Sequence, residues 1–216
     1  MLCEVDGKLP ERYKGSAMLS KKTTPERLTA FSDGVFAVII TIMVLDLKPP
    51  AEPTLRALLP LWPTALSYAV SYLFIAIIWV NHHHLFKFIH ESTPQLIWLN
   101  FAHLFMISLV PAATSWMAAT RLAAAPVFIY ALVFVLVEVA YISFERAAFA
   151  QAGDDDISPR MRRTARIRSY LALGIFSTAA AISFLSPPAG FSLVCCVLLI
   201  YLSPRVPDLF HRSVRR

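Results

Sequence analysis

The segment of residues 27–50, RLTAFSDGVFAVIITIMVLDLKPP, constrains the fold of this chain more than any other part of it. As an α-helix from Leu28 to Lys48 it would be roughly 30 Å long, which matches the hydrocarbon thickness of a bilayer. Asp33 lies about one turn inside this apolar run, and a carboxylate in lipid is costly unless it has a partner or a functional role. The segment therefore predicts a membrane-spanning helix that carries functional or network residues.

Five further apolar blocks follow, and with the first they predict one polytopic helical domain. The six blocks comprise residues 28–47, 62–81, 95–117, 124–144, 167–185 and 189–203. Most reach the roughly 17–25 residues of a spanning helix, the sixth being marginal, and lipid leaves these spans no structure but the helix. The composition agrees, since 57% of the 216 residues are hydrophobic, 16% are charged and the mean hydropathy is +0.59. We expect an all-α fold with six transmembrane helices.

The basic residues are distributed unevenly between the two sides that six spans define. With the N-terminus inside, all but three of the 20 Lys and Arg residues fall on one side, and the exceptions are Lys48, Arg56 and Arg121. This asymmetry predicts that both termini are cytoplasmic. We expect the protein to lie in the plasma membrane. The asymmetry also explains the net charge of +6 without nucleic acid as a partner. The arginines of residues 160–168 are interpreted as the same orientation signal, with binding of anionic lipid as the alternative.

Three regions follow from this topology. Residues 1–26 form a polar, basic cytoplasmic tail without the apolar core of a signal peptide, and residues 205–216 form a second basic tail. The six-helix membrane domain occupies residues 27–204. Thr24 and Pro25 mark the start of the first helix, because a hydroxyl at the cap position and a proline in the first turn are both typical of helix N-termini.

At about 100° per residue, the first span presents two separate stripes. The first stripe is apolar with one hydroxyl and the second holds the carboxylate. The first consists of Gly34, Val38, Thr41 and Leu45, with Ile42 at its edge and Arg27 and Phe31 at its cytoplasmic end; the second consists of Asp33, Ala37, Ile40 and Val44. If the first stripe faces a central axis, the carboxylate faces neighbouring helices, where we expect it to pair with an arginine or a histidine. The same spacing is also compatible with no pore at all. In that case the apolar residues face lipid or the core, and the threonine bonds to its own helix.

Three motifs add a family resemblance. Arg27, Phe31, Ser32 and Asp33 precede GVFAVIITIMVLDLKPP, the second motif is Trp79-Val80-Asn81-His82-His83-His84-Leu85-Phe86, and the third joins Leu99-Asn100 to Ser108-Leu109-Val110-Pro111. In these motifs the sequence resembles the transmembrane protein 175 family of potassium channels. The resemblance is close over the first half of the chain and is a hydropathy pattern over the second half.

The resemblance implies a single six-helix repeat of the prokaryotic kind, which assembles as a homotetramer in lipid and needs no cofactor besides the permeant potassium ion. It implies a pore lined by the first helix, with apolar rings of Val38, Ile42 and Leu45 and a hydroxyl ring of Thr41. Val38 departs from the family, in which Ile or Leu is usual, so the tightest ring is expected at Ile42 or Leu45. The remaining motif residues are interpreted as a structural network: Arg27, Phe31, Ser32, Asp33, Asn81, His82, His83, His84 and Asn100.

The three consecutive histidines do not predict a metal site. Neighbouring residues of a helix point about 100° apart, so His82, His83 and His84 cannot share one face. We expect one or two of them to hydrogen-bond Asp33, Ser32 or Asn100, and another to meet cytoplasmic water. Because histidine titrates near neutrality, the cluster is also a candidate for pH-dependent gating.

The leading functional hypothesis is a potassium-selective or potassium-permeable channel with a hydrophobic constriction. The alternative is a proton-coupled secondary transporter that uses Asp33, the histidines and Glu138 as a relay, and a third is a membrane scaffold. The first span has no internal proline and the chain shows no internal repeat, which favours the channel over the transporter. For Glu138 we expect a structural pair with Tyr141, Arg146 or a neighbouring helix. No motif of an enzyme is present.

Overall fold

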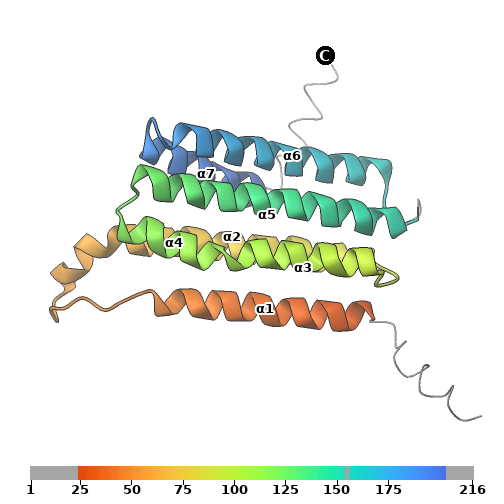
Figure 1. The fold of residues 1–216 in the computed structure, drawn as a ribbon, viewed down its shortest axis with the longest axis horizontal. Coiled ribbons are helices and arrows are strands. Elements are labelled where there is room, and N and C mark those ends of the chain that lie inside the picture. Colours follow the sequence, from red (N-terminus) through yellow and green to blue (C-terminus); the bar gives the residue numbers. More distant parts are fainter. Residues whose placement is uncertain (1–23, 154–155, 203–216) are drawn as a thin grey trace, which may run out of the picture.

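The computed structural model describes residues 24–153 and 156–202, and all regular structure in these residues is helical. The predicted N-terminal tail lies outside the described residues apart from residues 24–26, where the first helix already begins, and the tail of residues 205–216 lies wholly outside them. The helices are α1 (Pro25–Leu45), η3 (Leu55–Leu61), α2 (Trp62–Phe86), α3 (Pro94–Ser108), α4 (Val110–Ala119), α5 (Ala124–Gln151), α6 (Pro159–Ile182) and α7 (Pro187–Leu202). They lie side by side as one elongated bundle (Figure 1).

These helices make six crossings, as the six apolar blocks predict. Four helical segments are long and apolar enough to span a membrane, namely residues 25–45, 55–86, 94–119 and 124–151. The fifth crossing, α6, begins with an arginine-rich turn, and the sixth, α7, has 16 residues. Successive crossings alternate in direction, and α7 runs toward the end of the bundle at which α1 begins (Figure 1).

The third crossing is broken into two helices. The break lies at Leu109, two residues before Pro111, whose ring and missing N–H are incompatible with an uninterrupted hydrogen-bond ladder. Near the break, the Ser108 hydroxyl donates to the carbonyl of Phe105 at 2.7 Å. The sequence predicts an end or a kink at this proline, and the structure shows that the chain resumes as α4 in nearly the same direction (Figure 1).

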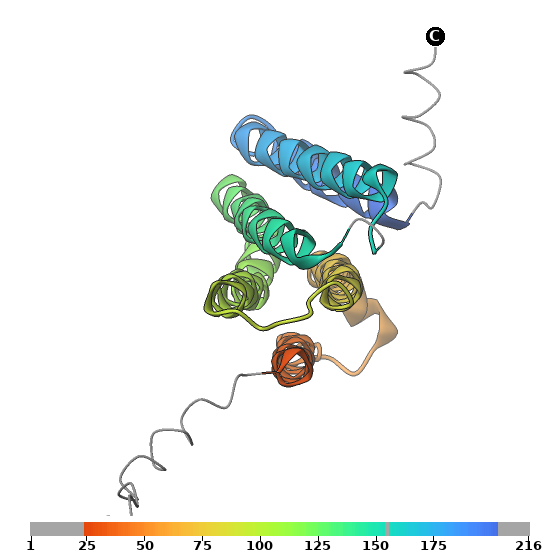
Figure 2. The ribbon, with the colours of Figure 1, turned by 90° about the vertical axis from the view of Figure 1, so that its right-hand side faces the viewer.

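The core of the bundle lies between α2, α5, α6 and α7 and is rich in aromatic rings. Phe74 and Phe134 have ring centroids 4.5 Å apart, and Phe176 stacks on Phe134 at 5.2 Å. A second apolar cluster packs around the start of α1 and the end of α2. It includes Leu28, Leu85, Leu96 and Phe144. Helix α1 contributes to both clusters through one face only and lies at the edge of the bundle (Figure 2).

The N-terminus of α1 differs in one detail from expectation. Thr24 occupies the cap position with extended backbone angles, and Pro25 follows in the first turn. The Thr24 side chain, however, makes no capping hydrogen bond to the helix. The proline, whose fixed φ suits the first turn, is therefore the clearer local start signal.

Candidate functional site

The candidate site is α1 together with the residues that hold it against α2 and α3. One face of α1 is buried against the bundle, and it carries Leu28, Ser32, Phe36, Ile39 and Met43. These residues recur every three or four positions, which is the spacing of one helix face. Because this face packs α1 against the bundle, the opposite face points out of the subunit.

The outward face is the stripe that the sequence singles out for a pore. The exposed fractions are 54% for Val38, 49% for Ile42 and 77% for Leu45, large values for apolar side chains of this size. Thr41, Gly34 and Arg27 are exposed on the same side. The structure thus brings the predicted constriction residues together on one unpartnered face of an edge helix.

Thr41 bonds to its own helix, as a threonine in an apolar helix commonly does. Its hydroxyl donates to the carbonyl oxygen of Val38 at 2.9 Å, three residues earlier. Since the hydroxyl proton is committed to the backbone, the lone pairs of the oxygen remain free to accept. An outward oxygen of this kind presents negative partial charge to a cation.

A groove runs between α1 and the broken third crossing. It has a volume of about 1040 Å³ and is lined mainly by apolar side chains. From α1 it receives Phe31, Val38 and Ile42, and from the other wall Pro111 and Trp116. The outward face of α1 is therefore continuous with an apolar groove that a neighbouring helix can fill.

Asp33 faces α2, as the second stripe predicts. Its Oδ1 accepts a hydrogen bond from the indole Nε1 of Trp79 at 2.8 Å. The partner is thus an indole and not the arginine or histidine that the sequence suggests. Trp79 in turn stacks on His83 with ring centroids 5.5 Å apart. Asp33 therefore joins α1 to α2 and lies outside the outward stripe.

Ser32, Asn100 and His82 form a buried hydrogen-bonded group that joins α1, α3 and α2. The Asn100 side-chain amide donates to Ser32 Oγ at 3.0 Å, and Ser32 Oγ donates to the carbonyl of Leu28 at 2.9 Å. The Oδ1 of Asn100 lies 2.7 Å from His82 Nε2, which must therefore carry the proton. All three side chains are fully buried, so this group sets the rotation of α1 about its own axis.

The remaining motif residues have different surroundings. Asn81 Oδ1 accepts from Arg168 Nη2 on α6 at 3.1 Å, so Asn81 belongs to the opposite side of α2. His83 and His84 are exposed. Phe31 packs edge-on against Phe101 of α3 at 5.4 Å. The motif therefore does not form one cluster but attaches α2 to α1, α3 and α6 separately.

Sequence reasoning missed three participants, namely Trp79 as the partner of Asp33, Arg168 as the partner of Asn81, and His103. The histidine is fully buried on α3 and stacks on His82 with centroids 5.8 Å apart. The positions of Trp79 and Asp33 near the cytoplasmic ends of adjacent spans were a usable signal for the first pair. Across the described residues no three His, Cys, Asp or Glu side chains are arranged to hold a metal ion.

Glu138 on α5 is buried, and its Oε2 accepts from the hydroxyl of Tyr201 on α7 at 3.4 Å. A pair with a neighbouring helix is one of the structural pairs that the sequence analysis expects. Arg146, another expected partner, instead bonds to the hydroxyl of Tyr170. Asp33 and Glu138 thus have separate hydrogen-bond partners.

Comparison with known proteins places this geometry in context. The family model described as the endosomal/lysosomal potassium channel TMEM175 matches residues 27–111. A potassium channel of Chryseobacterium sp. is 34% identical over 181 residues, which cover 84% of this chain and 94% of that protein. A potassium channel of Streptomyces collinus is 31% identical over 194 residues, with 84% and 93% covered.

A solved structure is similar over the same range. The crystal structure of a lysosomal potassium-selective channel TMEM175 homolog from Chamaesiphon minutus matches with a TM-score of 0.72 and 25% identity. The match covers 82% of this chain and 95% of that one. The similarity therefore includes the C-terminal crossings, which lie beyond the residues matched by the family model.

Proposed function

The chain belongs to the TMEM175 family of ion channels, and from this premise we propose that it forms a potassium-permeable pore lined by α1. It is a multi-pass membrane protein, and we place it in the plasma membrane with both termini in the cytoplasm. The observation that carries the proposal is the outward face of α1. Val38, Ile42 and Leu45 are exposed there beside the Thr41 hydroxyl, on a helix whose other face is fully engaged.

Assembly follows from the exposed apolar area of α1. A single subunit leaves this face and the adjoining groove uncovered, and contiguous exposed apolar surface marks a contact with protein or lipid. In the proposed homotetramer, four copies of α1 surround a common axis, and the groove beside each α1 receives apolar side chains of the next subunit. Closed rotational symmetry then repeats each side chain of the outward stripe as a ring.

The rings suggest how the pore selects and gates. Rings of Ile42 and Leu45 form a short apolar constriction that water enters reluctantly, so the pore closes by losing its water. A cation that passes must give up part of its hydration shell, and potassium holds that shell less tightly than sodium does. Four Thr41 oxygens beside the constriction replace part of the lost water, because each has already donated its proton to the Val38 carbonyl.

Asp33 has a supporting role in this mechanism. Its hydrogen bond to Trp79 directs the carboxylate toward α2. Around the axis of α1, Asp33 lies about 120° from Leu45, which is at the centre of the outward stripe. The carboxylate therefore contributes its field at the cytoplasmic end of the pore and is not a ligand of the passing ion. Ser32, through Asn100 and His82, holds the same end of α1 at a defined rotation.

Flux through liposomes tests the proposal. Purified protein is reconstituted into vesicles loaded with potassium, and efflux is followed with and without a proton gradient, with protein-free vesicles as the control. Passive efflux down the potassium gradient supports the channel. Efflux that strictly requires a proton gradient supports the transporter instead, and a folded oligomer without flux supports a scaffold. Either of the last two results overturns the proposal.

A further inference from the structure

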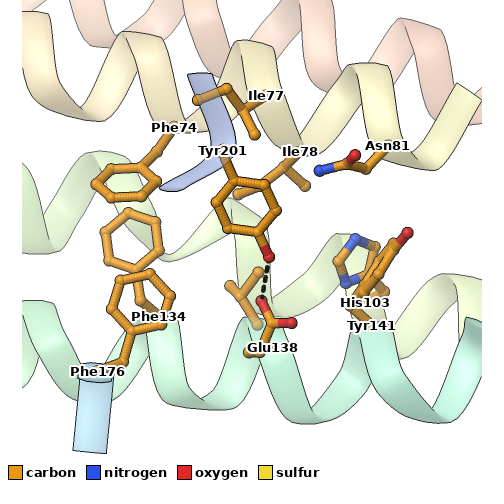
Figure 3. Close-up of a pocket in the computed structure, with 11 residues that line it drawn as sticks. Phe74, Ile77, Ile78, Asn81, His103, Phe134, Glu138, Tyr141, Phe176 and Tyr201 are labelled. Carbon is orange, nitrogen blue, oxygen red and sulfur yellow. Dashed lines mark hydrogen bonds between the residues drawn. The ribbon is translucent and has the colours of Figure 1, made fainter. Parts of the chain in front are cut away.

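A small, partly open pocket lies inside the bundle, away from the outward face of α1 (Figure 3). Its volume is about 20 Å³, and its walls come from α2, α3, α5, α6 and α7. Most of the wall is apolar and includes Phe74, Phe134 and Phe176. The polar part of the wall is formed by Glu138, Tyr201, Asn81 and His103, which Figure 3 shows around one space.

Two of these side chains are buried with polar atoms that lack a partner. By distance and angle, Glu138 Oε1 and both ring nitrogens of His103 make no hydrogen bond within the described residues, although the Ser169 side chain lies near Glu138 and the Val137 backbone lies near His103. Glu138 is 6% exposed and His103 is 0% exposed. A buried polar atom without a hydrogen bond is strongly unfavourable, and such atoms in folded proteins are usually satisfied by protein groups or by ordered water.

Some of the neighbouring polar groups are engaged with one another, whereas the Ser169 hydroxyl near Glu138 is itself buried without a hydrogen bond. The Tyr201 hydroxyl donates to Glu138 Oε2 at 3.4 Å, which leaves Oε1 as the free oxygen. The guanidinium of Arg168 lies over the Tyr201 ring at 5.1 Å and donates to Asn81 Oδ1. These contacts hold Tyr201, Arg168 and Asn81 together at the polar side of the pocket.

We propose that the cavity is a hydration site that binds one water molecule between Glu138 Oε1 and the imidazole of His103. The volume fits, because a buried water needs at least about 10–15 Å³ of such space and two to four polar partners. The chemistry also fits, since water donates one hydrogen bond to the free carboxyl oxygen and exchanges a second with the His103 ring. A metal ion fits poorly, because no third His, Cys, Asp or Glu ligand converges on the described part of this site.

The water would add a polar link between helices of the bundle. It links His103 on α3 with Glu138 on α5, and through Tyr201 the link continues to α7. His103 also stacks on His82, which belongs to the group that holds α1. The inference uses no residue of the outward face and does not rest on the proposed pore.

Thermal stability distinguishes a wet cavity from a dry one. In His103→Phe the two ring nitrogens are removed. If the cavity is dry, this substitution relieves two unsatisfied atoms, and the melting temperature stays unchanged or rises. If a water is present, the substitution removes one of its partners, and the melting temperature falls by a few degrees. At position 138, Glu138→Gln retains an oxygen acceptor and should cost less than Glu138→Met, although both change the contact with Tyr201.

In a second measurement the deciding signal is recorded on the unmodified protein. In water-edited solid-state NMR of ¹⁵N-histidine-labelled protein in lipid bilayers, the buried His103 ring should receive early magnetisation from water. The His103 signal is identified as the one that disappears from the spectrum of His103→Phe. Glu138→Met should abolish the early transfer to His103 while the exposed His83 retains its own transfer. An unmodified protein in which His103 receives no early transfer from water overturns the proposal.

Discussion

Asp33 on α1 accepts a hydrogen bond from the indole Nε1 of Trp79 on α2, with 2.8 Å between the two atoms. The bond joins the first two crossings near the end that the charge distribution places in the cytoplasm. It also directs the one carboxylate in the described apolar run of α1 toward a neighbouring helix. The orientation of the outward face therefore depends on a contact that lies on a different side of α1.

Removal of this contact should loosen α1. We expect Trp79→Phe to lower the free energy of unfolding by about 0.5–1.5 kcal/mol, because the carboxylate loses a hydrogen bond at a site where Trp79 is 38% exposed. Trp98→Phe is the matched control, since it removes a similar ring area from a side chain that is 71% exposed. Equal stability of the two variants, measured by thermal unfolding in detergent or lipid, would show that the bond contributes nothing.

Leu45→Ala should widen the apolar constriction. The truncated ring holds water more readily, so single-channel recordings should show a higher unitary conductance and a larger open probability. Val44→Ala is the control, because Val44 is also exposed but points about 100° away from Leu45. If both variants conduct like the unmodified protein, Leu45 is not part of the constriction.

Thr41→Ala should reduce the preference for potassium over sodium. The substitution removes four oxygens that face the ion, while the apolar rings on either side remain. Thr41→Ser retains the hydroxyl and should restore the preference, which separates the oxygen from the methyl group. Reversal potentials under bi-ionic conditions measure the change. Unchanged selectivity in Thr41→Ala, together with unchanged conductance in Leu45→Ala, would remove α1 from the pore.

Asn100→Leu should be the most destabilising of these substitutions. It leaves the protonated Nε2 of buried His82 without an acceptor and Ser32 Oγ without a donor, which we expect to cost about 2–4 kcal/mol of unfolding free energy. Ser108→Ala, which removes an exposed hydroxyl from the end of the same helix, should cost less than about 0.5 kcal/mol. A loss in Asn100→Leu no greater than in this control would mean that the buried group does not hold α1.

Glu138→Gln should leave potassium flux through liposomes unchanged. Glu138 lies on α5 and lines the small pocket inside the bundle, so it does not contact the proposed permeation path. The transporter alternative gives the opposite expectation, because there the carboxylate carries a coupled proton. Loss of flux in a Glu138→Gln variant that keeps its oligomeric state and stability would therefore favour the transporter. That result would not test the hydration site.

The crossings were predictable from the sequence because their cause is local. Each apolar block needs about 20 residues to span the hydrocarbon, whatever its neighbours are, so block 28–47 corresponds to α1 (Pro25–Leu45) and block 124–144 falls within α5 (Ala124–Gln151). The motifs of the first half were equally local, and the family they indicate is confirmed by relatives that match over most of the chain.

The grouping of side chains on α1 was also predictable. Helical periodicity places Val38, Thr41 and Leu45 on one face in any environment. Periodicity does not determine whether that face meets the core, lipid or a pore. In the structure the face points out of the subunit. Its role in a pore remains a proposal that the variants at Thr41 and Leu45 test.

The sequence alone therefore determined which segments cross the membrane, which residues share a face of α1 and to which family the chain belongs. Only the tertiary structure decided that Asp33 meets Trp79, that Asn81 meets Arg168, and that His103 and Glu138 line one pocket. The physical reason is that a hydrogen-bond partner on another helix depends on the rotation and depth at which two helices pack. Those are set by the summed shape of many side chains, and no local pattern contains them.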